Sequence, residues 1–146
     1  MFLGTYTPRL DEKGRFFLPA KFRDELGAGL VIARGQERCL QIFTPDEFQR
    51  EAARALSGSP TSRAARDFQR MYASGASQEV PDKQGRVTVP PTLRTYAGLD
   101  KDIAVIGAFN RLEVWDLAAW QAYEASNEEI FAQLDEDDSN GRDAVV

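Results

Sequence analysis

Residues 11–19 read DEKGRFFLP, and 71 positions later residues 82–90 read DKQGRVTVP. Both stretches open with D-x-x-G-R, continue with strand-forming residues and end at a proline. Aspartate caps backbone N–H groups at the start of tight turns, and glycine tolerates the positive φ that many turns require. Each stretch therefore predicts a tight turn that leads into a short strand.

The similarity between the two halves extends well beyond these stretches. At an offset of 71 or 72, each half shows a short strand, the turn, a second strand, a short helical segment closed by glycine, a hairpin of two strands and a longer helix. The hairpins are expected within residues 29–43 and 102–116, and the longer helices within residues 44–56 and 116–134. Thr44 and Asp116 are the expected N-caps of these helices, and Glu47 is expected to complete a capping box with Thr44. Such self-similarity indicates a duplicated unit of roughly 45 residues.

This pattern predicts an α+β fold, mainly β, in which the two units pair as a pseudo-dimer, because one unit alone buries too little apolar surface. We expect a first repeat with its helix at residues 1–55, a helical insert at 56–75 and a second repeat with its helix at 76–125. Residues 126–146 are expected to hold a helix end and an acidic, disordered tail. The insert places Ala64, Phe68, Met71 and Tyr72 on one helix face, as expected for core or for a subunit contact.

Composition narrows the possible functions. The chain has no histidine, which removes the commonest general acid–base residue and the commonest zinc ligand. Its single cysteine, Cys39, lies in a strand-like stretch, so we expect a buried thiol and no disulfide. No signal peptide and no apolar run of membrane-spanning length is recognisable. These features favour a cytoplasmic protein that is not an enzyme and that uses no cofactor or metal.

The charge is unevenly distributed along the chain. The net charge is −5 in total, but residues 1–94 carry 15 basic and 11 acidic residues, a net of +4. Residues 95–146 carry 3 basic and 12 acidic residues, a net of −9. The acidic total therefore does not exclude a basic, nucleic-acid-binding surface in the first two thirds of the chain.

The arginines that follow the two turns are the main candidates for binding. Arg15 and Arg86 each start a strand, and Lys13 and Lys83 add charge at the turns. A guanidinium suits phosphate oxygens or the guanine edge, and a two-stranded β element can enter the major groove. The same spacing also allows Asp11 to pair with Arg15, and Asp82 with Arg86, merely to fix the loop. Both interpretations hold at once if each aspartate positions its arginine.

Two other function classes fit parts of the pattern. The D-x-x-G-R surface or the acidic C-terminal half could bind a partner protein. Alternatively, a pseudo-two-fold could bring Asp11 and Asp82 together as a catalytic carboxylate pair. The charged and polar residues after each aspartate suit an exposed turn better than a desolvated catalytic site, so the carboxylate pair is the weakest of the alternatives.

The opening MFLGTY and the doubled D-x-x-G-R-[FV]-x-[LV]-P pattern resemble the MraZ family over about residues 1–125. That resemblance implies a transcriptional regulator encoded with cell-division and cell-wall genes. It also implies that each half is an AbrB-like swapped-hairpin unit, with two units interlaced into one β-barrel. Family members form rings, often octameric, that bind short G-rich direct repeats in their own promoter.

By the same resemblance, the D-x-x-x-R segments bind double-stranded promoter DNA, and the protein is nucleoid-associated. The DNA-binding residues would be Arg15, Arg86, Lys13, Lys83 and Arg9, with Asp11, Asp82, Gly14 and Gly85 shaping the turns. Lys21, Arg23 and Arg94 are weaker candidates that could be structural or contact phosphate. Gln84 stands where the first repeat has Lys13, so the two repeats need not bind alike.

Overall fold

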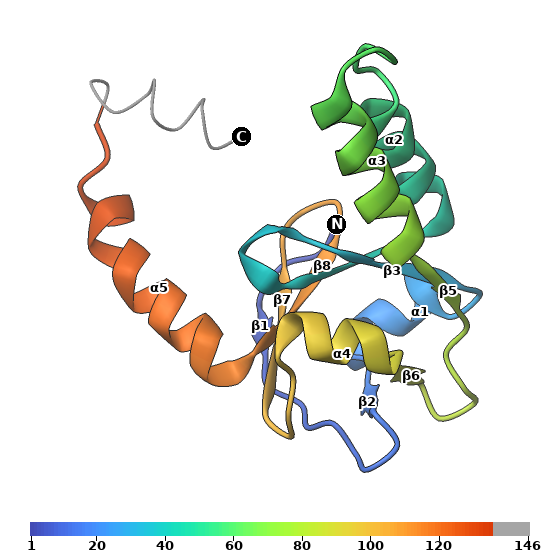
Figure 1. The fold of residues 1–146 in the computed structure, drawn as a ribbon. Helices are drawn as coiled ribbons and strands as arrows, with labels where there is room; N and C mark the ends of the chain where they lie inside the picture. Colours follow the sequence, from blue (N-terminus) through green and yellow to red (C-terminus); the bar gives the residue numbers. More distant parts are fainter. Residues whose placement is uncertain (136–146) are drawn as a thin grey trace.

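The computed structural model describes residues 1–135 (Figure 1). The first repeat forms strands β1 (Thr5–Tyr6), β2 (Arg15–Phe17), β3 (Leu30–Arg34) and β4 (Leu40–Phe43). The second repeat forms the equivalent strands β5 (Ser77–Glu79), β6 (Arg86–Thr88), β7 (Ile103–Gly107) and β8 (Leu112–Asp116). The α-helices are α1 (Arg23–Leu26), α2 (Pro45–Ala55), α3 (Arg63–Gly75), α4 (Pro91–Ala97) and α5 (Leu117–Ala132). The predicted α+β fold with a duplicated order of elements is confirmed.

The two repeats exchange strands. The larger sheet has six antiparallel strands in the order β1-β7-β8-β4-β3-β5. Strand β1 of the first repeat pairs with β7 of the second, and β5 of the second repeat pairs with β3 of the first. The two hairpins meet where β4 pairs with β8. Each repeat therefore completes the sheet of the other, as expected for interlaced units.

The remaining strands, β2 and β6, form a separate two-stranded ribbon (the β2–β6 ribbon). The six-stranded ladder ends at β1 and β5 and does not continue into this ribbon. The strand pairing therefore does not confirm the expected closed barrel. The strands β2 and β6 are too short to join the hydrogen-bonded ladder of the six-stranded sheet. Each has three residues, because a glycine turn precedes it and a proline follows it.

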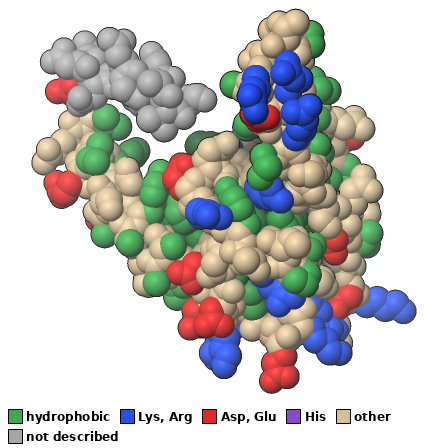
Figure 2. All heavy atoms as spheres, in the orientation of Figure 1, with side chains coloured by type: hydrophobic (Ala, Val, Ile, Leu, Met, Phe, Trp, Pro, Cys, Tyr) green, Lys and Arg blue, Asp and Glu red, His purple; other side chains and the backbone are tan. Residues whose placement is uncertain are grey.

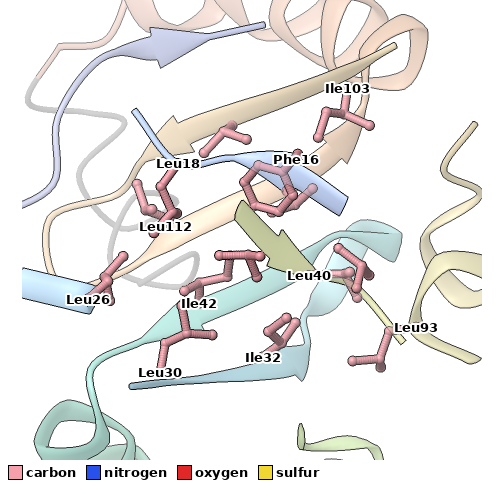
Figure 3. Close-up of a cluster of buried hydrophobic side chains, with 14 of the residues drawn as sticks. Phe16, Leu18, Leu26, Leu30, Ile32, Leu40, Ile42, Leu93, Ile103 and Leu112 are labelled. Carbon is pink, nitrogen blue, oxygen red and sulfur yellow. The ribbon is translucent and has the colours of Figure 1, made fainter. Parts of the chain in front are cut away.

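One hydrophobic core lies between the ribbon and the sheet (Figure 3). The ribbon contributes Phe16 and Val87, which face each other in register and are almost completely buried. Leucine and isoleucine side chains of the hairpins fill the space opposite them. The alternation along the ribbon follows from the two-residue period of a strand, which sends the neighbours of Phe16 and Val87 to the outer face.

The short helical segments after the two prolines differ. In the second repeat, α4 ends at Gly98, whose φ of 61° closes the helix in the left-handed conformation. In the first repeat, a 3-10 turn over Ala20–Phe22 precedes the single turn of α1. This segment also ends at a glycine, Gly27, but Gly27 keeps a right-handed φ of −64°.

The longer helices begin where the sequence indicated. The hydroxyl of Thr44 accepts from the backbone N–H of Glu47, and Asp116 caps α5 through the N–H of Ala119. The Glu47 side chain does not complete a capping box, because it accepts from Asn110 instead. The helices α2 and α3 form a pair that packs on β3 and β4, whereas α5 starts on β7 and β8 and projects away from that half of the sheet (Figure 1).

No helix within residues 1–135 is long and apolar enough to cross a membrane. The acidic tail predicted to be disordered lies mostly outside the described residues, which end at residue 135.

Candidate nucleic-acid interface

The aspartate of the first turn organises the whole loop. One oxygen of Asp11, Oδ1, accepts from the backbone N–H groups of Lys13 and Arg15, both at 2.9 Å. The other, Oδ2, accepts from Nε of Arg15 at 2.8 Å. Two main-chain bonds close the turn, from Gly14 N–H to the Asp11 carbonyl and from Asp11 N–H to the Arg15 carbonyl. The carboxylate thus fixes both the backbone and the arginine side chain.

The second turn repeats this arrangement. The Oδ1 atom of Asp82 accepts from the N–H groups of Gln84 and Arg86 at 3.0 and 2.9 Å, and Oδ2 accepts from Nε of Arg86 at 2.7 Å. Gly14 and Gly85 adopt φ angles of 76° and 81°, which L-residues with a side chain rarely tolerate. Both turns therefore have the same set of carboxylate hydrogen bonds and a glycine with positive φ before the arginine.

The hydrogen bonds to the two carboxylates stabilise their charged form. The pKa of Asp11 lies below its usual range, chiefly because the Arg15 backbone N–H donates to it and also because of the Arg15 side chain. The pKa of Asp82 is lowered in the same way by Arg86. Both aspartates are therefore fully ionised at neutral pH, which keeps each arginine oriented.

Pairing with aspartate leaves donor nitrogens of each arginine side chain without a hydrogen bond in residues 1–135. The bond to aspartate is made by Nε, and within residues 1–135 the two Nη atoms of Arg15 and of Arg86 make no hydrogen bond. These nitrogens can still donate to phosphate oxygens or to a guanine edge. The structural and the functional interpretation of the D-x-x-x-R spacing are thus compatible.

The β2–β6 ribbon brings the two arginines onto one surface. Arg15 lies opposite Thr88, and Phe17 lies opposite Arg86, with the buried pair between them. Since side chains alternate, these four residues share the outer face of the ribbon. Arg15 and Arg86 are separated along the ribbon by about 7 Å. The Arg86 guanidinium also lies 6.0 Å from the ring of Phe17, which is half exposed.

Each turn also receives a guanidinium from the other repeat. A Cβ added to Gly14 would lie 2.7 Å from the Arg94 guanidinium, and one added to Gly85 would lie 2.6 Å from Nε of Arg23. Arg23 is held by its bond to the Leu18 carbonyl, and Arg94 by its bond to the Val89 carbonyl. The absence of a side chain at each glycine therefore makes room for the arginine of the partner repeat.

Arg23 and Arg94, here called the crossed arginines, were only weak candidates in the sequence. Their positions in the chain do not predict their contact with Gly85 and Gly14, because that contact forms between the two repeats. The main chain is crossed in the same way, since Leu18 N–H donates to the Gly85 carbonyl and Val89 N–H donates to the Gly14 carbonyl. Phe17 was missed as well, although its place two residues after Arg15 puts it on the same strand face.

The other predicted DNA-binding residues lie around the turns. Lys13 and Lys83 are exposed at the loops. Arg9 lies beyond the first turn, where Nε is 3.2 Å from a carboxylate oxygen of Asp102. It borders a surface hollow of about 500 Å³ that Arg94 and Lys101 also line. Arg9 is thus close to the first turn but has an acidic partner of its own.

The structure does not bring Asp11 and Asp82 together. Each carboxylate is bound to the arginine of its own turn, and the ribbon register places the two turns at opposite ends of the strands. No hydrogen bond joins the two aspartates within the described chain. This geometry does not support the carboxylate pair that a catalytic interpretation requires. No cluster of acidic residues and cysteine in residues 1–135 is arranged to hold a metal ion.

The comparison with known proteins agrees with the duplicated pattern. A family model described as "MraZ protein, putative antitoxin-like" matches twice, at residues 1–71 and 72–140. The chain is 60% identical over 137 residues to "Transcriptional regulator MraZ" of Micrococcus luteus, covering 94% of this chain and 96% of that protein. It is 61% identical to the protein of the same name from Kineococcus radiotolerans and 56% identical to that from Thermobifida fusca, with the same coverage. The chain belongs to the MraZ family.

Proposed function

We propose that this protein is a sequence-specific DNA-binding transcriptional regulator, not an enzyme, and that it binds double-stranded DNA through the two D-x-x-x-R turns. The proposal rests on one observation above all. The β2–β6 ribbon presents Arg15 and Arg86 on one outer face, and an ionised aspartate holds each of them in place. A two-stranded ribbon with oriented guanidinium groups matches the shape and the donor requirements of the major groove.

The proposed roles divide between reading and positioning. Arg15 and Arg86 contact guanine edges or phosphates, and Lys13, Lys83 and Arg9 supply weaker phosphate contacts. Asp11, Asp82, Gly14 and Gly85 hold the turns in shape. The names of the curated relatives support the regulatory role. The working units are residues 1–55 and 76–125, joined by the insert at 56–75.

Assembly is the second part of the proposal. The chain is acidic overall, with a net charge of −5, so one copy would bind DNA weakly. A ring, octameric by resemblance to the family, places several ribbons on one DNA molecule and so raises their effective concentration. The bound DNA then carries short direct repeats about 10 base pairs apart, in the promoter of the protein's own cell-division and cell-wall gene cluster. Such a protein acts in the cytoplasm at the nucleoid.

Fluorescence anisotropy with a labelled promoter fragment tests this proposal. The fragment comes from upstream of the protein's own gene, and a scrambled fragment of the same length serves as control. We expect tighter binding to the promoter, with an affinity that falls steeply as salt is raised, because phosphate contacts release counterions. Arg15→Ala and Arg86→Ala should each lower promoter affinity by about tenfold or more, while the size of the oligomer in solution stays the same.

A matched control variant distinguishes a specific role of the two turn arginines from the general loss of one positive charge. Arg50→Ala removes an exposed arginine from α2, on the other side of the molecule. We expect this variant to bind the promoter nearly as well as the unchanged protein. Unaltered affinity of Arg15→Ala would refute the assignment of the turns. Equal, weak binding to promoter and scrambled DNA would refute the regulator and favour a protein partner for the same surface.

A further inference from the structure

Phe17 is an exposed aromatic side chain on the outer face of the β2–β6 ribbon. Its exposed fraction is 51%, whereas Phe16, the residue before it, is 1% exposed. Phe16 faces the core opposite Val87, and the alternation of strand side chains therefore sends Phe17 outward. Single exposed apolar side chains are common on protein surfaces and have no functional meaning by themselves. Phe17 differs from such cases in the side chains that surround it.

The surroundings of Phe17 on this face are polar and positively charged. Phe17 lies directly opposite Arg86, and Arg15 and Thr88 form the other pair of the same face. Neither three-residue strand contains an acidic residue. Figure 2 shows Lys and Arg side chains, with Asp and Glu among them, around the lower end of the molecule, where Figure 1 places the ribbon. The outer face of the ribbon thus sets one apolar side chain beside two guanidinium groups.

The ring of Phe17 lies next to the guanidinium of Arg86 but is not covered by it. The guanidinium carbon is 6.0 Å from the centre of the ring, which is at the outer limit of about 6 Å for a cation–π contact. Nε of Arg86 is held separately by Asp82 at 2.7 Å. The contact with the ring is therefore loose, and half of the Phe17 surface stays accessible to another molecule.

Strand formation does not by itself explain an aromatic ring at this position. The equivalent residue of the second repeat is Thr88, which lies opposite Arg15 just as Phe17 lies opposite Arg86. Threonine is a favoured strand residue and exposes a hydroxyl and a single methyl group. The same backbone position is thus filled in one repeat without exposing a large apolar surface. Phe17 adds to the outer face an apolar contact surface that the fold does not require.

The major groove of DNA offers one apolar group that such a surface fits, the 5-methyl group of thymine. Phenylalanine is among the side chains that contact this methyl group. The Cβ atoms of directly opposite residues in an antiparallel pair are about 4.5–5.5 Å apart. Successive nucleotides of one DNA strand are about 3.4 Å apart along the helix axis. When Arg86 contacts one nucleotide, Phe17 is therefore within reach of the next one or two base pairs.

We propose that Phe17 contacts the 5-methyl group of a thymine that lies one or two base pairs from the nucleotide bound by Arg86. Phe17 is then a specificity-determining residue, and the bound DNA carries a thymine at that position. The inference rests on the proposed function and adds a chemical group that the two arginines do not read, because a guanidinium only donates hydrogen bonds. Phe17 carries no charge, so it contributes to the choice of sequence and not to non-specific binding.

Replacing thymine by deoxyuridine tests this contact, because the two nucleotides differ in the major groove only by the 5-methyl group. The promoter fragment of the anisotropy experiment is prepared with deoxyuridine at every thymine position, so the test does not depend on knowing the operator. We expect this fragment to bind the unchanged protein at least about fourfold more weakly than the thymine fragment, for the loss of one buried methyl group. Equal binding of the two fragments would overturn the proposal.

The Phe17→Ser variant assigns this difference to Phe17. We expect it to bind the thymine fragment about fourfold more weakly than the unchanged protein does, and to bind both fragments equally. Leu3→Ser is the matched control, because Leu3 is 50% exposed but lies outside the ribbon. This control should prefer the thymine fragment by the full factor. A preference that persists in Phe17→Ser would mean that another group reads the methyl, which contradicts the proposal.

The Phe17→Leu variant distinguishes contact with DNA from support of Arg86. Leucine keeps an apolar side chain at this position but removes the aromatic ring beside the guanidinium. We expect the variant to retain the preference for thymine to within about twofold, because apolar contact with the methyl group remains. A loss as complete as in Phe17→Ser would show that the ring acts only through Arg86, and the proposal would then be wrong.

Binding to the scrambled fragment at low salt separates this inference from the proposed function. Phe17→Ser should keep this non-specific binding, because the variant removes no charge. Its loss would show that Phe17 has a structural role and would overturn the inference. Equal binding of the unchanged protein to promoter and scrambled DNA would refute the regulator itself. Preference for the promoter, together with equal binding of its thymine and deoxyuridine forms, would refute only the role of Phe17.

Discussion

The two turns of this protein have the same internal geometry and different surroundings. The distances from the arginine N–H and Nε to the aspartate agree within 0.1 Å between the turns. Around this frame, Glu12 and Lys13 of the first turn are replaced by Lys83 and Gln84 in the second. The comparison teaches that aspartate, glycine and arginine determine the loop, while the positions between them are free to set its charge.

The ribbon shows the same contrast. Phe17 lies beside Arg86, whereas its equivalent, Thr88, lies beside Arg15. The hollow next to the first turn has a volume of about 500 Å³, and the hollow next to the second has a volume of about 150 Å³. The molecule is therefore two-fold symmetric in its backbone pairing and asymmetric in the surface around its two turns.

The glycines offer the strongest way to break the shared geometry. Gly14→Ala and Gly85→Ala should each lower the free energy of unfolding by about 2 kcal/mol. The alanine would be strained at the positive φ of each site, and its Cβ would displace the crossed arginine beside it. Gly98→Ala is the control, because its φ is also positive but its Cβ would meet nothing within 4 Å. That variant should cost about 1 kcal/mol. Denaturant unfolding measures all three, and equal losses at the three sites would show that the crossed arginines contribute nothing.

Exchanging the charges at the variable turn positions 12 and 83 sharpens the comparison and leaves the aspartate, glycine and arginine of each turn unchanged. Glu12→Lys should raise promoter affinity severalfold, and Lys83→Glu should lower it by a similar factor, about 1 kcal/mol each. The dependence of affinity on salt should become steeper in the first variant and shallower in the second. Anisotropy titrations at several salt concentrations measure both. Unchanged affinity in both variants would mean that these loop tips point away from the DNA.

Acidification should affect the two turns alike and has the smallest expected effect. Because the folded-state pKa of Asp11 and Asp82 is depressed, their contribution to stability is complete above the ordinary value of 3.8. It is lost as the pH falls through the lower folded values. Carboxyl chemical shifts followed by NMR should show both groups titrating below pH 3.8.

The same titration in Arg15→Ala provides the control. The pKa of Asp11 should rise only partway, because the largest cause of its shift is the backbone N–H of residue 15, which the variant retains. Asp82 should be unaffected, since its partners lie in the other turn. A full return of Asp11 to its ordinary value would mean that the side-chain pair alone holds the turn.

The sequence by itself determined the local features of this protein. The duplication, the turn at each D-x-x-G-R, the hairpins and the caps at Thr44 and Asp116 could be predicted, because they depend on residues close together in the chain. So could the choice of Arg15 and Arg86 as candidates. Local chemistry was misleading at the Glu47 side chain, where a bond from Asn110 replaced the expected one.

Tertiary structure alone decided which copy of each element pairs with which. Equivalent strands of the two repeats have similar patterns, so the sequence does not distinguish pairing within a repeat from exchange between repeats. The exchange puts both arginines on one ribbon and lays Arg94 on Gly14 and Arg23 on Gly85. It also leaves α5 uncovered while α2 is covered by α3. These features depend on contacts between residues far apart in the chain, which a pattern of neighbouring residues does not encode.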